Sequence, residues 1–313
     1  MASTQTLPAT SVDGLVSAAK NAAGLEWSGT FLRLCVVPPR APQRGAAPAN
    51  AAPPGPPARS SWYAEPAKVA DNFYFMGTKI HNAWALVGSE GIVVFEALFD
   101  YAAPDEIADG MRKLGLDAGK VKYVLLSHAH GDHDGGARFL QDKMPGAHLL
   151  YGGPDWDAVD KSTNRPGGKP KHDTVGTDGM KLSVGDSSVQ IVTTPGHTAG
   201  TLSFLFEIRD NGKPLRVAYV GGTAIPFDGT AAYYDGYIAS VDKMAKAAAD
   251  FGATALLSNH TEFDNGYYKA HTAANRKPGE ANPFDVGRDA VDRYFTLVEQ
   301  CTTAAKVRAA GKP

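Results

Sequence analysis

Cysteine is scarce in this chain, and its scarcity limits the kinds of cross-linking and metal binding that are open to the protein. The 313 residues include only Cys35 and Cys301. Two thiols cannot build a cysteine-based zinc framework or a small domain held by several disulfides. The two are either bonded to each other, which would tie the N-terminal part to the C-terminal part, or independent thiols.

Long apolar runs and an excess of charge of either sign are also missing. No apolar stretch approaches the length of a membrane span. The 31 basic and 33 acidic residues give a formal net charge of −2, which offers little attraction for nucleic acid or an anionic membrane. We therefore expect a small-molecule partner, with no nucleic acid and no membrane. The sequence carries no signal for the oligomeric state.

Composition divides the chain into an N-terminal region, residues 1–61, and a body, residues 62–313. Residues 11–24 are rich in alanine and end in glycine, which predicts a short helix. Residues 38–58 are dominated by proline, alanine and glycine, a composition that buries little surface. A flexible tether is the favoured interpretation of this arm, and an arm that lies over the active site is the alternative.

The body alternates between predicted strands and predicted helices twice over. Apolar runs predict strands at residues 72–76, 83–87, 91–95, 121–126 and 147–151, and again at 181–184, 189–193, 202–208, 215–220 and 255–258. Helical spacing predicts helices at 104–114, 135–143, from 155 onward, 241–251 and 286–308. This order favours an α/β fold in which two sheets pack face to face with helices outside, a four-layer αββα sandwich.

The densest group of reactive side chains directly follows the predicted strand at 121–126. The run Ser127-His128-Ala129-His130-Gly131-Asp132-His133 places three histidines and one aspartate within six residues. His128 and His130 point to the same side of an extended segment, so both can bind one ion. Asp132 and His133 follow a glycine that permits a turn, which aims them at a neighbouring position. These residue types at this density predict a divalent-metal site.

Two more histidines occur where the chain turns after a predicted strand. His197 lies in a Pro-Gly turn, and His260 follows the strand at 255–258. Because ligands from several loops commonly meet at one edge of a sheet, these two can join the cluster. Five histidines and one aspartate suffice for two ions with three protein ligands each. The remaining histidines are expected to be structural or solvated: His81, His148, His172 and His271.

These motif pieces resemble the metallo-β-lactamase superfamily. The resemblance rests on residues 128–133 with Gly135-Gly136, on residues 194–200 around His197, and on His260, and it covers the chain from about Trp62 to the C-terminus. It implies the four-layer fold and metal-dependent hydrolysis. The pattern is most similar to the third subclass of metallo-β-lactamases, which uses histidine ligands and no cysteine ligand.

The resemblance also implies a ligand set and a reaction. His128, His130 and His197 would hold a first zinc ion, and Asp132, His133 and His260 would hold a second. A metal-bound hydroxide would open the amide bond of a β-lactam antibiotic, and Asp132 would orient water and pass a proton to the leaving group. Since such enzymes are exported, the resemblance implies a periplasmic or secreted protein that confers antibiotic resistance, and we expect that a signal peptide has been removed.

Three positions depart from the family pattern. Gly222 stands where lactonases and glyoxalase II-like relatives place a metal-bridging aspartate, and where third-subclass lactamases usually have serine. Ala224 lacks the second serine that is often found nearby, which leaves Thr223 as the candidate hydroxyl for substrate binding. Glu96 replaces the aspartate that is common in such strands, and we expect it to accept a hydrogen bond behind a metal ligand.

Aromatic residues predict a substrate groove formed by loops at residues 156–168, 225–237 and 262–268. Tyr233 is the predicted substrate contact, and its aromatic neighbours favour a substrate with an apolar or aromatic group. Core or surface packing is the alternative for each of these neighbours: Phe227, Tyr234, Tyr237, Phe263, Tyr267 and Tyr268. A run of basic residues in and just after the first loop would attract a substrate carboxylate or form only a solvated surface: Lys161, Arg165, Lys169 and Lys171.

The sequence leaves three alternatives to a β-lactamase. The nearest is a hydrolase of the same fold that acts on another cyclic amide, lactone or ester, although Gly222 argues against lactonases with a bridging aspartate. Diiron flavoproteins share the fold, but they typically have a glutamate in the metal motif and a fused flavin domain, which this pattern does not match. A non-catalytic scaffold is disfavoured because all six metal positions carry competent ligands.

Overall fold

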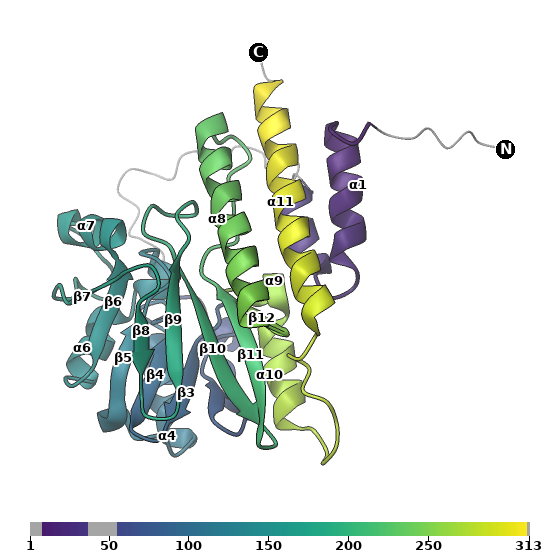
Figure 1. Ribbon diagram of the computed structural model, residues 1–313. Helices are drawn as coiled ribbons and strands as arrows, with labels where there is room; N and C mark the ends of the chain where they lie inside the picture. The colour runs from purple at the N-terminus through teal and green to yellow at the C-terminus, as the bar shows by residue number, and fades with distance from the viewer. Residues whose placement is uncertain (1–7, 37–54, 312–313) are drawn as a thin grey trace.

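The structure, a computed structural model, describes residues 8–36 and 55–311. Two β-sheets pack face to face, and helices cover both outer faces (Figure 1). This arrangement confirms the predicted α/β sandwich of four layers. Residues 38–54 of the proline-rich arm lie outside the described residues, so the interpretation of the arm stays a prediction. The division of the chain at residue 61 also stays a prediction.

The first sheet has seven strands in the order β1-β2-β3-β4-β5-β6-β7. The strands from β1 to β4 are antiparallel neighbours, and those from β4 to β7 are parallel. The carboxyl ends of the parallel strands therefore meet at one edge, where loops can gather functional groups. The bounds are β1 (Ala67–Ala70), β2 (Phe73–Phe75), β3 (Trp84–Gly88), β4 (Gly91–Phe95), β5 (Val121–Leu125), β6 (His148–Gly152) and β7 (Thr174–Gly176).

The second sheet has five strands in the order β12-β11-β10-β9-β8. Its strands are antiparallel neighbours except for β11 and β12, which run parallel. The chain therefore leaves β11 and β12 at the same edge of this sheet. The bounds are β8 (Lys181–Ser183), β9 (Ser188–Thr193), β10 (Leu202–Asp210), β11 (Lys213–Val220) and β12 (Ala255–Ser258).

Helices precede, separate and follow these strands. Before the first sheet lie α1 (Val12–Ala23), α2 (Ser28–Cys35) and α3 (Arg59–Trp62). Within the first half lie a π-helical turn η1 (Pro104–Ala108), α4 (Asp109–Lys113), a 3-10 turn η2 (Ala118–Lys120), α5 (Gly131–Asp134), α6 (Ala137–Lys143) and α7 (Gly153–Lys161). The second half contains α8 (Ala231–Phe251), α9 (Thr261–Asp264), α10 (Gly266–Ala274) and α11 (Arg288–Ala310). None of the helices in the described part of the chain is both long enough and apolar enough to span a membrane.

Three apolar clusters hold the layers together. Aromatic rings of both sheets fill the space between them, and Phe95 of β4 stacks on Phe206 of β10 with ring centroids 4.8 Å apart. Side chains of α1, α2, α8 and α11 cover the outer face of the second sheet, and those of α4, α6 and α7 cover the first. Because both faces of each sheet are buried, several strands are continuous apolar runs, which made them visible in the sequence.

The two cysteines form a disulfide that joins α2 to α11. Of the two alternatives that the sequence left open, the bonded pair is therefore the one observed. The helix expected at residues 11–24 is α1, which lies along α11 (Figure 1). The bond and this helix packing fix the N-terminal segment onto the body of the protein.

Three segments predicted as loops are wholly or partly helical, which corrects the expected groove. Helix α8 begins at Ala231, ten residues before the predicted start, because Thr230 caps it by accepting a hydrogen bond from Tyr233 N. Helices α9 and α10 occupy the loop expected at 262–268, and α7 continues to Lys161. Glycine and tyrosine weaken the helical signal in these stretches, and tertiary packing of their apolar faces overrides that weakness.

Candidate metal centre

All six predicted ligands lie on loops or helix starts that follow strands at one edge of the sandwich. The first motif leaves β5 and enters α5, the Pro-Gly turn joins β9 to β10, and the last ligand lies two residues after the end of β12. The sheets bring together His128, His130, Asp132, His133, His197 and His260. Strand ends separated by more than a hundred residues thus supply one cluster.

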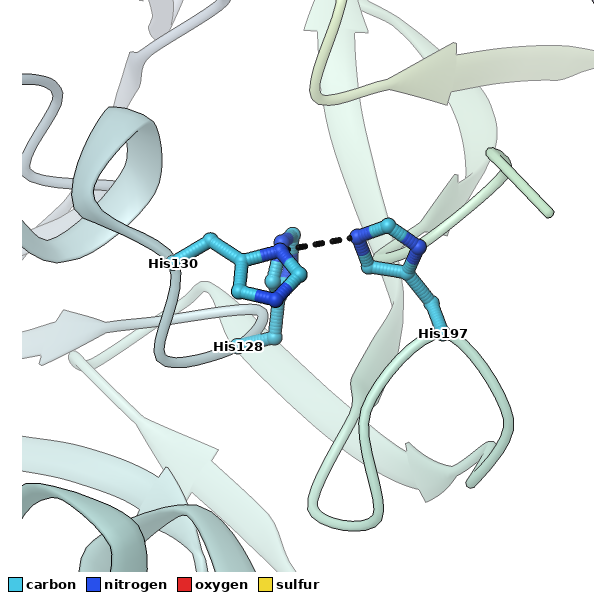
Figure 2. Close-up of side chains that lie close together, drawn as sticks. All are labelled: His128, His130 and His197. Atoms are coloured by element: carbon cyan, nitrogen blue, oxygen red, sulfur yellow. Dashed lines mark hydrogen bonds between the residues drawn. The ribbon is translucent and has the colours of Figure 1, made fainter. Parts of the chain in front are cut away.

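The first group of ligands consists of His128, His130 and His197, whose rings lie close together at nearly right angles (Figure 2). One nitrogen from each lies within 4.8 Å of the others, and His130 Nδ1 is 3.1 Å from His197 Nε2. Two ligands bound at about 2.0–2.1 Å to one tetrahedral ion stand roughly 3.3 Å apart. The spacing of these nitrogens therefore fits a shared metal ion.

Hydrogen bonds fix which ring nitrogens carry the free lone pairs. His128 Nδ1 donates to Gly221 O at 2.9 Å, and His197 Nδ1 donates to Ala224 O at 2.7 Å. Each Nε2 is therefore unprotonated in the neutral ring, and burial lowers the pKa of both imidazoles, which keeps them neutral. His128 Nε2 is buried without a hydrogen-bond partner. A metal cation satisfies this otherwise costly atom, so the donor set fits a metal ion.

The second group is built around the carboxylate of Asp132. Its Oδ2 lies 3.2 Å from His133 Nε2 and 3.3 Å from His260 Nε2, and these two nitrogens are 2.9 Å apart. Burial alone would raise the pKa of Asp132, but the adjacent imidazoles of His133 and His260 outweigh it and hold that pKa well below its usual range. The aspartate is thus an anion at a point where imidazole nitrogens converge, as expected for a second metal ion.

His81 lies in the second group, which corrects the expectation that it is structural or solvated. Its Nε2 is 3.5 Å from Asp132 Oδ2, and its ring centroid is 4.8 Å from that of His260. The residue belongs to the turn between β2 and β3, which opens at the same edge of the first sheet. That position between two predicted strands was the one available signal, but an isolated histidine carries little weight by itself.

Glu96 lies behind the second group, as expected from its place at the end of β4. Its Oε1 accepts a hydrogen bond from Tyr219 OH at 2.8 Å, and its Oε2 is 3.6 Å from His133 Nδ1. Burial raises the pKa of Glu96 to about 8. Its carboxyl group thus lies next to the outer nitrogen of His133, which has no hydrogen-bond partner among the described residues, and a carboxylate in such a place can orient a metal-binding histidine.

Two buried aspartates that the sequence analysis did not identify hold the ligand loops in place. Asp155 of α7 accepts hydrogen bonds from Ala129 N at 2.8 Å and Gly200 N at 2.9 Å, so it ties the first motif to the Pro-Gly turn. Asp134 contacts the guanidinium of Arg165, and burial raises its pKa to about 7. The sequence around each of these aspartates looks like that of an ordinary residue at the start of a helix. Their roles are therefore visible only in the tertiary structure.

Gly222 is required by its close contact with a metal ligand. A Cβ atom at this position would lie 2.5 Å from His197 Cβ and 3.0 Å from His197 Cγ. Real Cβ atoms essentially never approach so closely, and the backbone of His197 is held by its turn. The departure from aspartate or serine at this position therefore follows from the local packing, because any side chain here would displace His197.

The Gly222→Ala variant should bind metal more weakly at the first group. The added methyl would push His197 away from His128 and His130, and misplacing a ligand through its surroundings costs about 10–100-fold in metal affinity. Competition with a chromophoric chelator measures this affinity directly. Gly236→Ala is the matched control, since a Cβ there meets nothing within 4 Å. Equal affinities in the two variants would show that the contact with His197 has no role.

The two predicted substrate contacts, Thr223 and Tyr233, have different surroundings in the structure. Thr223 is buried, with its Oγ1 2.8 Å from Tyr294 OH and 3.3 Å from Ser258 Oγ, so its hydroxyl is engaged under α11 and does not fit a substrate contact. The backbone at the end of β11 turns this side chain to the helix-covered face. Tyr233 is half-buried beside Tyr234 on α8, and its role in substrate binding stays a prediction.

The side chains of the basic run at residues 161–171 either contact neighbouring residues or are exposed to solvent. Arg165 contacts Asp134, and Lys169 Nζ donates to Asp160 O at 2.9 Å. Lys161 and Lys171 are exposed. Of the two interpretations of this run, the structure therefore favours a solvated and locally paired surface.

A groove of mixed polar and apolar lining runs beside the metal centre between α2 and the segment after β11. It has a volume of about 240 Å³ and is lined by Leu32, Arg33, Leu34, Val36, Ala224, Ile225, Phe227 and Phe263. Two contacts join it to the ligands, because Ala224 O holds His197 and the ring of Phe263 packs 5.8 Å from that of His260. Of the predicted aromatic wall, Phe227 and Phe263 line this groove, whereas Tyr234 and Tyr237 are buried in the core.

Comparison with known proteins agrees with this fold. Residues 76–210 match the family model described as metallo-beta-lactamase superfamily. Over this stretch the chain is similar to the metallo-β-lactamase superfamily, whose members include metal-dependent hydrolases. BJP-1, a subclass B3 metallo-beta-lactamase of Bradyrhizobium japonicum, is similar with a TM-score of 0.63 and 26% identity, covering 74% of this chain and 90% of that one. FEZ-1 from Legionella gormanii has a TM-score of 0.69 at 19% identity over 79% and 97% of the two chains, which shows the shared fold.

Curated relatives match a shorter part of the chain. The N-acyl homoserine lactonase AttM of Agrobacterium fabrum is 34% identical over 119 residues, which are 34% of this chain and 43% of that protein. A hydroxyacylglutathione hydrolase of Xanthomonas axonopodis is 29% identical over 122 residues, 39% of this chain and 41% of that protein. The chain thus spans less than half the length of these two relatives. The names of these two relatives refer to different substrates.

Proposed function

We propose that this protein is a zinc-dependent hydrolase that opens the amide bond of β-lactam antibiotics. The proposal rests on two ligand groups that converge at the edge of the sandwich and on a groove beside them that is partly lined by apolar side chains. Zinc bound by such ligands supplies a water with a pKa near 7 and polarises a carbonyl group. Nitrogen and carboxylate ligands at these spacings suit zinc.

The observation that carries the proposal is the composition of the two ligand groups. The first consists of three histidines, and Gly222 leaves no room for a carboxylate at the position from which relatives bridge the two groups. This is the pattern for which the sequence resembles the third subclass of lactamases rather than lactonases with a bridging aspartate. The similarity to BJP-1 over 90% of that enzyme's chain supports the same choice.

Residues of this chain would bind the substrate, transfer a proton and hold the ligand loops in place. The groove lined by Leu32, Phe227 and Phe263 would bind an apolar substituent of the substrate next to the ligands. Asp132 Oδ2, at the meeting point of the second group, would orient a water and carry a proton to the departing nitrogen. Asp155 would keep the two ligand loops in register during turnover.

A periplasmic or secreted location and a role in antibiotic resistance belong to the same proposal. The Cys35–Cys301 disulfide supports export, because disulfides persist in oxidising compartments and are rare in the cytosol. Fractionation of cells that express the full-length gene, together with growth of those cells on a penicillin, tests both statements. Activity confined to the cytosol would contradict the proposed location.

Hydrolysis of a chromogenic cephalosporin by the zinc-loaded protein is the decisive experiment. We expect turnover that a chelator abolishes, with kcat/KM of about 10⁴ M⁻¹s⁻¹ or more, and activity on penicillins and carbapenems. Metal content is measured on the same sample. Turnover several orders of magnitude lower, with two zinc ions bound, would reject the β-lactam substrate.

A hydrolase acting on a lactone or an ester is the second candidate. The names of the relatives from Agrobacterium fabrum and Xanthomonas axonopodis favour it, although they match only part of the chain. Assays with acyl lactones, thioesters and aryl esters under the same conditions compare the two candidates. A preference of a hundredfold or more for one of these substrates would favour this alternative.

A further inference from the structure

We propose that His81 is a fourth protein ligand of the second metal ion, beside Asp132, His133 and His260. The inference rests on the proposed zinc-dependent function, since it adds a ligand to the centre on which that function depends. The family resemblance assigns three ligands to this ion and none from the turn between β2 and β3. His81 reaches the cluster from that turn.

A set of hydrogen bonds holds this turn in one position. Thr78 Oγ1 accepts hydrogen bonds from Ile80 N at 3.1 Å and His81 N at 2.8 Å, and Thr78 N donates to His81 O at 2.8 Å. The loop is thus closed on itself around the histidine. A ligand on such a loop needs little ordering when a metal ion binds.

The same turn is bonded to the segment that carries His260. Asn82 N donates to Asn259 O at 2.9 Å, and Thr261 N donates to Ile80 O at 2.8 Å, so His81 and His260 face each other across a short β-bridge. The Asn82 side chain adds a bond from Nδ2 to Ser258 O at 2.8 Å. The fold therefore sets the two imidazoles as a pair.

The distances within the cluster suit one ion with four ligands. His81 Nε2 lies 3.5 Å from Asp132 Oδ2, close to the 3.2 and 3.3 Å that separate this oxygen from His133 Nε2 and His260 Nε2. Ligand atoms of one tetrahedral zinc ion are separated by roughly 3.3 Å. The His81 ring is mostly buried and rests edge-on against Phe99 at 5.1 Å, which limits its other orientations.

A fourth ligand from His81 would compensate for the metal-binding side chain that is missing at Gly222. A bridging aspartate at that position would bind both ions, but His197 excludes any side chain there. With His81 included, the second group has three nitrogens and one oxygen, a complete tetrahedral set of the kind found in closed zinc sites. The first group, with three histidines, keeps the open position. The two sites should therefore differ in affinity and in access to water.

Cobalt spectroscopy of the His81→Cys variant tests direct ligation without any substrate. The protein is stripped with chelator and reloaded with two equivalents of Co²⁺. We expect a thiolate-to-cobalt charge-transfer band in the near ultraviolet, because a cysteine at position 81 would bind the metal. The control is His148→Cys, whose side chain is 63% exposed and pairs with Asp173 outside the cluster. This control should show no band.

The His81→Ala variant gives a second and independent readout. Loss of a direct ligand should weaken the second metal by at least about tenfold in chelator competition, the lower bound for outer contacts of a metal site. The affinity of the first metal should stay unchanged. His81→Gln separates ligation from a hydrogen bond to Asp132, since the amide could restore that bond but not a strong metal ligand.

The outcomes distinguish this inference from the proposed function. Unchanged metal affinity in His81→Ala overturns the inference, and so does restoration by His81→Gln, absence of a cobalt–thiolate band in folded His81→Cys, or binding of fewer than two ions by the wild type. If His81→Cys fails to fold, the chelator competition decides. A His81-dependent second site in a protein that does not hydrolyse β-lactams would reject the proposed substrate and leave the inference standing.

Discussion

The His128→Ala variant should lose hydrolytic activity by at least about a thousandfold, because the first metal contributes several kcal/mol to the transition state. His128 Nε2 is the buried nitrogen that points into the first group without another partner. The same loss is expected for His197→Ala. Initial rates at saturating zinc, together with zinc content, measure the effect.

The fold should survive this substitution. Gly221 O, which accepts from His128 Nδ1, keeps its second hydrogen bond from Asn259 Nδ2 at 2.7 Å. Circular dichroism and thermal unfolding of the metal-free proteins should therefore be close to wild type. His148→Ala is the control for removing an exposed histidine. Wild-type turnover in His128→Ala or His197→Ala with half the metal content would show that the first group is wrongly assigned.

Removal of the disulfide should lower the free energy of unfolding by about 2–4 kcal/mol. The bond joins residues 266 positions apart and thereby restricts the unfolded chain over most of its length. The change is made by Cys35→Ala with Cys301→Ala, because both side chains are buried and alanine introduces no polar atom. Urea unfolding, monitored by circular dichroism, gives the free energy.

Reductant supplies the control for this experiment. Dithiothreitol should shift the unfolding midpoint of the wild type towards that of the double variant and leave the variant unchanged. The zinc is removed from both proteins beforehand, so that thiols do not compete for metal. A double variant as stable as the oxidised wild type would contradict the stabilising role of this bond.

Much of the fold was predictable because burial on both faces makes strands continuous apolar runs. Gly91–Phe95 is an example, buried throughout and predicted with its observed ends. Val121–Leu125 was predicted within one residue of its ends, although Lys122 is exposed. Helix α8 was predicted ten residues too short, since the stretch from Ala231 contains Gly236 and three tyrosines. Its helical state depends on packing against the second sheet and α11, which local sequence does not encode.

Some residues of the metal centre could likewise be predicted from the sequence, and one could not. The first motif could be found because its ligands are neighbours in sequence and follow a strand. His197 and His260 could be added because each ends a predicted strand at the same edge. His81 could not, because nothing near it in sequence marks it as a ligand. His81 is brought beside Asp132 and His260 by contacts between distant segments, such as the hydrogen bond between Asn82 and Ser258, which are 176 residues apart.

The sequence by itself determined the fold class, the edge where the ligands gather and the six residues expected to bind metal. These follow from short-range patterns of apolar residues and of histidine and aspartate spacing. The tertiary structure alone decided that Cys35 meets Cys301, that Thr223 turns to the helix-covered face, and that Gly222 makes room for His197. Those outcomes depend on which face a side chain takes at the end of a strand and on contacts between distant segments, and a shift of one residue reverses the face.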